Sequence, residues 1–241
     1  MTFAAMLLAD ARLPTGGHAY SSGVEPALRG GLAAERVREL MLGRAVTTSC
    51  VEAGTAVVAR HLLVPFDTPP SSAAQGAESS VSGLLAVEKA WAARTPSPAL
   101  RDASRELARG YRRLARRLWP ESPALAALDR WFLSGAEGLD RPCRAVVLGA
   151  MAVELGLSPE DLVRLVIYDE AAGAAAALLK LEPRDPAEVS GWIMDACAAA
   201  EPRVAGLAAL TESAAIPAAS APQSEEWAQA HATSDRRLFR A

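Results

Sequence analysis

The residues best suited to chemistry by type and spacing lie in one short segment, residues 13–25. It contains His18, Ser21 and Glu25 within eight residues. These are the residue types of a hydrolytic triad, in which a base activates a hydroxyl and an acid orients the base. No Gly-x-Ser-x-Gly elbow surrounds Ser21, and the glycines lack the lysine of a phosphate-binding loop. A hydrolase therefore ranks third among the hypotheses, and we expect no catalytic residue.

Turn chemistry explains the same segment more simply. Pro14 and Gly16 favour a turn, and Ser21 or Ser22 can cap the helix that follows. Glu25 would then lie in the first turn, where its charge complements the helix dipole and the free N–H groups. The segment is thus predicted to be a shaped loop that leads into a helix.

The three histidines and three cysteines show no metal-ligand spacing, because no two lie close together in the chain. They are His18, His61 and His231, and Cys50, Cys143 and Cys197. We expect free, mostly buried thiols and no metal bound directly by this chain. The acids Asp169 and Glu170 precede a run of small residues, 173–177, which favours close helix packing first and a buried acidic site second.

A basic helix is predicted over residues 98–118, with apolar residues on one face and arginines on the next. The apolar residues are Leu100, Leu107, Tyr111, Leu114 and Leu118, and the arginines are Arg101, Arg105, Arg109, Arg112 and Arg116. Such a face could bind nucleic acid or anionic lipid. A solvated face with salt bridges is favoured, because the net charge is -3 and no aromatic residues interleave with the arginines.

Helix starts recur along the chain as a capping residue followed by proline at the first helical position. They are Ser97-Pro98, Ser122-Pro123, Ser158-Pro159 and Asp185-Pro186. Glycines at 30–31 and 156 are typical helix ends. The predicted helices span residues 5–10, 22–29, 34–63, 84–93, 98–118, 123–134, 142–155, 159–181, 186–200 and 202–213, with a short one at 223–231.

The helix over residues 34–63 should break or kink, because it contains Thr47, Thr48 and two glycines. Residues 65–82 are rich in Pro, Ser and Gly and predict a flexible surface loop. Residues 1–33 form the N-terminal motif segment, and residues 216–241 form a docking tail that ends in a cationic, aromatic cluster. We predict one all-α domain of about ten helices over residues 1–241.

Composition supports this fold class, since the chain has 53 alanines and only 5% aromatic residues. Alanine is the best helix former and leaves little volume for a β-sandwich core. The apolar stretch at residues 3–9 has no basic residue before it and does not resemble a secretory signal. No stretch approaches the about 20 apolar residues of a membrane span. We expect a cytoplasmic protein.

Three segments resemble the UreF family of urease accessory proteins. Residues 13–25 resemble the family's opening motif, L-P-x-G-x-[aromatic]-x-x-S-x-G-[LV]-E, although His18 replaces the usual aromatic residue. Residues 142–181 resemble its central helices, without the L-G-Q sequence that often follows. His231 and the run Arg237-Leu238-Phe239-Arg240 are similar to the closing H…RLFRS, with Ala241 in place of serine.

The resemblance implies a maturation factor that is not an enzyme. UreF-like proteins are all-α and dimeric, and they bridge UreD (also called UreH) to the GTPase UreG, so that GTP hydrolysis drives nickel insertion into the urease apoprotein. It implies partner binding by Arg237, Leu238, Phe239 and Arg240, with Arg240 the first choice for GTPase contact. It also implies a second partner or dimer surface, which consists of Tyr20, Ser21, Gly23 and Glu25.

Overall fold

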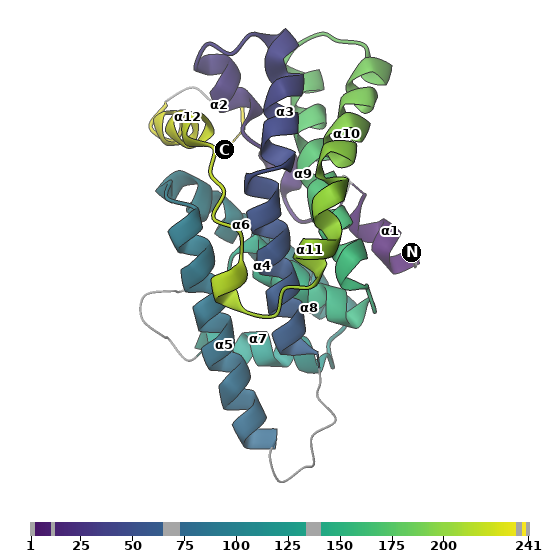
Figure 1. Ribbon diagram of the computed structural model, residues 1–241, viewed down its shortest axis with the longest axis vertical. Coiled ribbons are helices and arrows are strands. Elements are labelled where there is room, and N and C mark those ends of the chain that lie inside the picture. The colour runs from purple at the N-terminus through teal and green to yellow at the C-terminus, as the bar shows by residue number, and fades with distance from the viewer. Residues whose placement is uncertain (1–2, 11–12, 65–72, 134–140, 235–237, 240–241) are drawn as a thin grey trace.

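The computed structural model describes residues 3–10, 13–64, 73–133, 141–234 and 238–239, and these residues form an all-α fold (Figure 1). The predicted fold class is confirmed, since the structure is 76% helical and has no strand among the described residues. The helices are α1 Phe3–Leu8, α2 Val24–Arg29, α3 Val37–Ala45, α4 Thr48–Leu63, α5 Ala73–Arg94, α6 Pro98–Leu118, α7 Pro123–Leu133, α8 Arg144–Glu154, α9 Pro159–Leu181, α10 Pro186–Ala200, α11 Val204–Ala208 and α12 Pro222–Ala232.

Helix α4 runs through the middle of the molecule and packs against α5, α8, α9 and α11 (Figure 1). Eleven of its fifteen residues from Ser49 to Leu63 are buried and the other four are partly buried, so no residue of this stretch is fully exposed. Small residues allow the close packing: a Cβ added to Gly149 of α8 would lie 2.6 Å from the Ala56 carbonyl oxygen of α4. The alanine content therefore lets helix backbones approach one another in a single hydrophobic core cluster.

All four predicted proline-led helix starts are confirmed. The side chains of Ser97, Ser122, Ser158 and Asp185 each accept a hydrogen bond from a backbone N–H in the first turn of α6, α7, α9 and α10. The predicted helix ends are confirmed as well, since Gly31 and Gly156 have positive φ angles directly after α2 and α8. Local sequence signals thus set most of these boundaries.

The predicted break within residues 34–63 lies between α3, which ends at Ala45, and α4, which begins at Thr48. Thr47 lies at the break, and its hydroxyl donates to the carbonyl oxygen of Gly43 at 2.7 Å. A β-branched residue that bonds back to the preceding turn in this way favours the interruption of a helix.

Two predictions need correction. The loop expected over residues 65–82 is wrong in its second half, because residues 73–82 belong to α5, while residues 65–72 lie outside the described part of the chain. Alanine, glutamine and glutamate in this stretch are strong helix formers and outweigh its serines and glycine. The helix expected over residues 202–213 is shorter, since α11 ends at Ala208.

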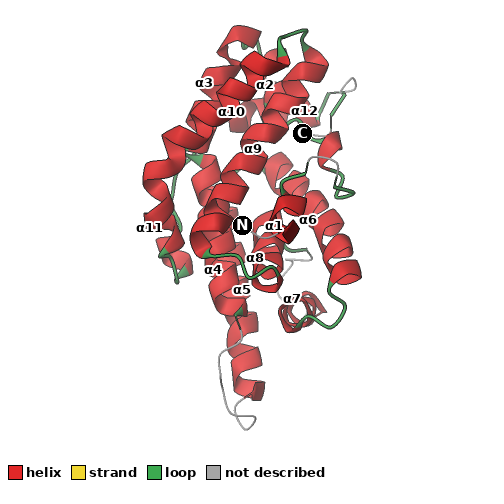
Figure 2. Ribbon diagram, turned by 90° about the vertical axis from the view of Figure 1, so that its right-hand side faces the viewer, coloured by secondary structure: helices red, strands yellow, loops and turns green. Residues whose placement is uncertain are grey.

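In the view of Figure 2, α11 and α6 lie on opposite sides of the molecule, with α4, α8 and α9 between them. Helix α12 packs against α2 and α6, which brings the end of the chain beside its N-terminal segment. The ring of Trp227 fits against Gly30, where an added Cβ would lie 2.2 Å from the indole. In the part of the chain that the structure describes, no helix is both long and apolar enough to cross a membrane.

Candidate functional site

The motif segment at residues 13–25 folds into a loop, a single 3-10 turn over Gly17–Ala19 and then helix α2. The loop touches α6 and α9 through two glycines of those helices. A Cβ on Gly110 would lie 2.0 Å from the Thr15 carbonyl oxygen, and one on Gly173 would lie 2.7 Å from Ser22 Oγ. Position 110 therefore requires a glycine for this close packing, because the Thr15 atoms it meets belong to the backbone, whereas the Ser22 hydroxyl next to Gly173 can rotate.

The predicted serine cap of this helix is wrong. Helix α2 begins at Val24, its N-cap is Gly23, and no side chain caps it. Ser22 has a φ of 49° and Gly23 a φ of 82°, so two successive residues adopt left-handed backbone. Glycine is favoured at 23 because it adopts such angles without strain.

Glu25 instead binds the C-terminal tail. Its carboxylate is 2% exposed and accepts the backbone N–H groups of Leu238 at 2.8 Å and Phe239 at 2.7 Å. Arg29 Nε donates to the same carboxylate at 3.1 Å. Hydrogen bonds that an ionised acceptor receives are stronger than neutral ones, so this contact holds the tail against α2.

Three further contacts surround the tail. His231 Nε2 lies 3.3 Å from the Phe239 carbonyl oxygen and 3.4 Å from Glu25 Oε2. Lys180 of α9 lies 5.4 Å from the centre of the Phe239 ring, a cation–π distance. Phe239 is buried, whereas its neighbour Leu238 is 66% exposed. The tail is thus anchored by one apolar side chain and presents another to solvent.

The structure describes six of the partner-binding residues that the sequence singles out, and it places them differently. Glu25 and Phe239 anchor the tail, and Ser21 is fully buried. Tyr20, Gly23 and Phe239 line one cavity, while Leu238 faces outward. Arg237 and Arg240 lie outside the described residues. The structure thus brings the motif and the tail together into one surface.

The triad hypothesis does not fit this arrangement. Ser21 has no exposed surface from which its hydroxyl could attack a substrate, and Glu25 is bound to the tail. His18 is exposed on the 3-10 turn. Because a triad needs an accessible nucleophile next to its base, these three residues do not form one.

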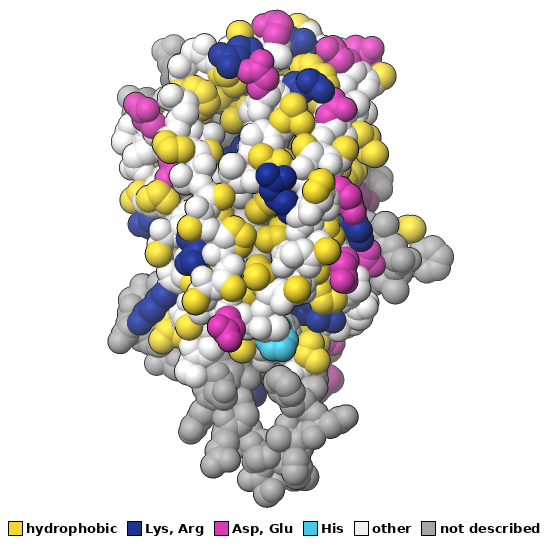
Figure 3. Space-filling view, in the orientation of Figure 1, with side chains coloured by type: hydrophobic (Ala, Val, Ile, Leu, Met, Phe, Trp, Pro, Cys, Tyr) yellow, Lys and Arg dark blue, Asp and Glu magenta, His cyan; other side chains and the backbone are white. Residues whose placement is uncertain are grey.

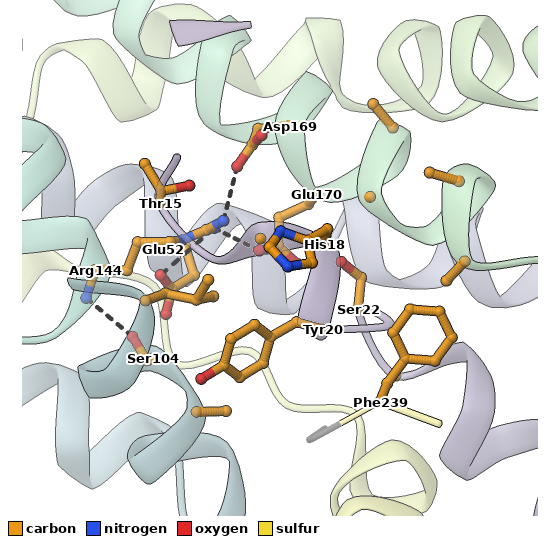
Figure 4. A pocket seen from close by; sticks show the side chains of 18 of the residues that line it. Thr15, His18, Tyr20, Ser22, Glu52, Ser104, Arg144, Asp169, Glu170 and Phe239 are labelled. Atoms are coloured by element: carbon orange, nitrogen blue, oxygen red, sulfur yellow. Dashed lines mark hydrogen bonds and ion pairs between the residues drawn. The ribbon is translucent and has the colours of Figure 1, made fainter. Parts of the chain in front are cut away.

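The cavity has a volume of about 350 Å³ and lies between the motif loop, α6, α9 and the tail (Figure 4). His18, Tyr20 and Phe239 stand around it in that view, and Arg144 lies on its inner side. Small residues of α9, among them Gly173 and Ala176, form one wall.

A buried ion network lies on the inner side of this cavity. Arg144 is 7% exposed, donates to Asp169 at 2.8 Å and binds Glu170, and its backbone N–H donates to Ser104 at 3.0 Å (Figure 4). Arg44 donates to the other oxygen of Glu170 at 2.6 Å. The network joins α3, α8 and α9, so removal of one partner would leave an uncompensated buried charge.

A third carboxylate completes the network. Trp91 Nε1 of α5 donates to Glu52 of α4 at 2.6 Å, and Glu52 lies 3.9 Å from Arg144. Burial raises the pKa of Glu52 although Arg144 opposes the shift. Burial by itself would also raise the pKa of Glu170, but Arg144 and Arg44 outweigh it and leave that pKa lowered.

The alternative prediction of a buried acidic site at Asp169 and Glu170 is right only in part: their side chains are partly buried, at 27% and 14% exposed, and arginines pair with both. In the described residues, no group of three or more His, Cys, Asp or Glu side chains could hold a metal ion. The three cysteines are free, and Cys50 and Cys143 are buried. The sequence offered no signal that Arg44 and Arg144, which are 100 residues apart, would meet at one glutamate.

The arginines of α6 mostly make contacts within the protein, as the favoured hypothesis requires. Arg101 donates to the Thr95 and Pro96 carbonyl oxygens, Arg109 pairs with Glu106, and Arg112 and Arg116 pair with Asp129. Figure 3 shows the opposite face of the molecule, on the side of α11, where basic side chains lie among acidic and apolar ones.

Comparison with known proteins decides the family. The UreF family model matches residues 44–197. The urease accessory protein UreF of Mycobacterium marinum is 36% identical over 247 residues, which cover 99% of both chains. The chain belongs to the UreF family. The UreF of Mycolicibacterium vanbaalenii is 34% identical over 80% of each chain, and that of Mycobacterium bovis BCG Pasteur is 37% identical over 79% of this chain and 78% of its own.

Membership of the UreF family supports a role in urease maturation. It also agrees with the site, in which a loop motif and the C-terminal tail are in direct contact. The features that the UreF resemblance singles out at the two ends of the chain are therefore parts of one structural unit.

Proposed function

We propose that the protein is a cytoplasmic scaffold of urease maturation that bridges UreD (UreH) and the GTPase UreG. In this role it couples GTP hydrolysis to nickel insertion into the urease apoprotein, acts as a homodimer, binds no cofactor of its own and catalyses no reaction itself. Nickel is cargo of the assembled complex. Family membership supports the maturation role.

The observation that carries the scaffold proposal is the anchored tail. Glu25 fixes the backbone of Leu238 and Phe239, and Leu238 remains 66% exposed directly beside the fixed residue. A rigidly held, exposed apolar side chain loses little conformational entropy on binding, which favours its use as an anchor for a partner. Arg240 follows within two residues, and its guanidinium can pair with carboxylates or phosphates.

The test is co-elution of the purified protein with UreG and UreD in size-exclusion chromatography with light scattering. The wild type should elute as a dimer and as a ternary complex, and Arg240→Ala and Leu238→Asp should each weaken the complex. Met194→Asp on α10 is the matched control, because Met194 is also 66% exposed. No complex at about micromolar concentration, or loss of binding only in the Met194 variant, would contradict the proposal.

A further inference from the structure

A second cavity lies on the other side of the motif loop, between that loop and helix α6. It has a volume of about 660 Å³. On the side of the motif loop it is lined by Pro14, Gly16 and Tyr20, and on the side of α6 by Arg109, Arg113 and Arg116. Gly110, which also lines the cavity, allows the Thr15 backbone to pack directly on α6. We call this cavity the arginine groove.

The arginine groove keeps an excess of positive charge although most of its arginines have partners. Two carboxylates serve four guanidinium groups: Glu106 pairs with Arg109 and Arg141, and Asp129 pairs with Arg112 and Arg116. Counted over the described residues, the two carboxylates therefore balance two of these four positive charges. Arg113 is exposed, and among the described residues no acidic side chain pairs with it.

These pairs also fix the geometry of the groove. Asp129 holds Arg112 and Arg116 at 2.8 and 2.5 Å, and the Arg112 guanidinium stacks 4.3 Å from the centre of the Phe132 ring. A guanidinium that is already oriented loses less entropy when it binds a carboxylate with its free N–H groups. The arginine groove is therefore preorganised for acidic ligands.

We propose that the arginine groove binds an extended, acidic segment of a partner protein. Arg109, Arg113 and Arg116 lie at successive turns, so their side chains follow one another at about 5–6 Å over about 10 Å of helix. Alternate side chains of an extended strand lie about 6.6 Å apart. A segment with acids at every second position matches this spacing with two or three carboxylates.

Two other polyanions fit the groove less well. Tyr20 is the only aromatic residue among those that line it, whereas single-stranded nucleic acid needs several stacking surfaces. A lipid bilayer would need the apolar face of α6, but Ala108, Tyr111 and Ala115 on that face are buried and α6 packs against α8 and α12. The described groove therefore favours a peptide.

The inference deepens the proposed scaffold role, since it names the chemistry of one partner segment. Its test uses fluorescence anisotropy of a fluorescein-labelled octapeptide of alternating glutamate and serine, at low salt, with the full-length protein alone. A peptide with glutamine in place of glutamate is the ligand control. The double variant Arg109→Glu/Arg113→Glu should weaken binding about tenfold or more, since two guanidinium contacts are reversed in sign.

Arg203→Glu is the matched variant, because Arg203 is exposed and lies just before α11, on the far side of the molecule from α6 (Figure 2). It should change the affinity less than about twofold. Circular dichroism should show that both variants stay folded. Equal binding by the double variant, or no binding by the wild type at about millimolar peptide, would overturn the inference.

Two further ligands complete the test. If a thymidine oligonucleotide or phosphatidylserine vesicles bind more tightly than the peptide, and the double variant loses that binding, the groove is a nucleic-acid or lipid site and the inference is wrong. The peptide assay contains no urease partner. Failed peptide binding therefore leaves the scaffold role intact, and failed co-elution with UreG and UreD leaves the groove intact.

Discussion

The Glu25 carboxylate accepts the backbone N–H of Phe239 at 2.7 Å, although 214 residues separate the two in the chain. The same carboxylate also accepts the N–H of Leu238, so two consecutive backbone amides of the tail donate to one buried side chain. A negative charge in the first turn of α2 thereby serves two purposes, because it complements the helix dipole and fixes the tail.

Glu25→Gln should loosen the tail. A glutamine can accept one of the two amide hydrogen bonds through its oxygen, but its NH₂ group would face the other N–H as donor against donor. We expect a loss of about 1–3 kcal/mol in the free energy of unfolding. Urea denaturation measures this loss, and hydrogen exchange should show faster exchange at the amides of Leu238 and Phe239.

Glu39→Gln is the control for this variant. Glu39 pairs with Arg36 on the surface, where both side chains are more than half exposed. Exposed ion pairs contribute little, so the change in stability should stay below about 1 kcal/mol. An equal loss in both variants would show that the Glu25 contact does not hold the tail.

Phe239→Ala tests the apolar anchor of the tail. Phe239 is buried and its ring lies beside Lys180, so truncation removes buried surface and a cation–π contact. We expect a loss of about 2–4 kcal/mol, measured by thermal or urea denaturation. Leu238→Ala, next to it and 66% exposed, should cost less than about 0.5 kcal/mol. If the two variants lose the same stability, the tail is not anchored as described.

Much of this fold follows from local signals in the sequence. Ser97, Ser122, Ser158 and Asp185 cap helices because a side-chain oxygen and a proline act within one turn, and no distant residue is needed. The break at Thr47 is local in the same sense. Most helix starts and ends and the all-α class could therefore be predicted from the sequence alone, whereas the cap of α2, the start of α5 and the end of α11 could not.

The site depends on contacts between distant residues, which no local pattern reveals. Arg44, Arg144 and Glu170 come from three helices and meet only after α3, α8 and α9 pack together. Similarly, the charge of Glu25 suggested a helix-dipole role, and its carboxylate turned out to bind a segment at the other end of the chain. The family motif identified the two halves of the surface, but packing decides that they adjoin.

Glu88→Gln tests the pH dependence of stability. Glu88 of α5 is fully buried, and its Oε2 accepts the N–H of Cys143, the residue that precedes α8, at 3.0 Å. Arg105 lies 3.8 Å from the other oxygen. Burial raises the pKa of Glu88 to about 7, because the Cys143 amide and Arg105 compensate it incompletely.

The raised pKa of Glu88 determines whether stability rises or falls with pH. The folded protein holds this proton more tightly than the unfolded chain, so stability falls as the pH rises from about 4.5 to about 7 and the carboxylate must ionise in place. In Glu88→Gln the side chain does not titrate, and its amide oxygen can still accept the N–H of Cys143. Its stability relative to the wild type should rise by about 3 kcal/mol across this range, measured by urea denaturation at successive pH values. A pH-independent difference would contradict the role of burial.

Gly110→Ala tests the seat of the motif loop on α6. An added Cβ would lie 2.0 Å from the carbonyl oxygen and 2.8 Å from the Cα of Thr15, and backbone atoms cannot turn aside as a flexible side chain can. The loop must therefore move away from α6, which would cost about 1–3 kcal/mol of stability and widen the arginine groove. Gly43→Ala in α3 is the matched control, because nothing lies within 4 Å of its added Cβ. That variant should gain up to about 1 kcal/mol from helix propensity. Opposite signs in urea denaturation would confirm that Gly110 is needed for the close approach of Thr15, whereas a gain in both variants would show that the loop is not seated on α6.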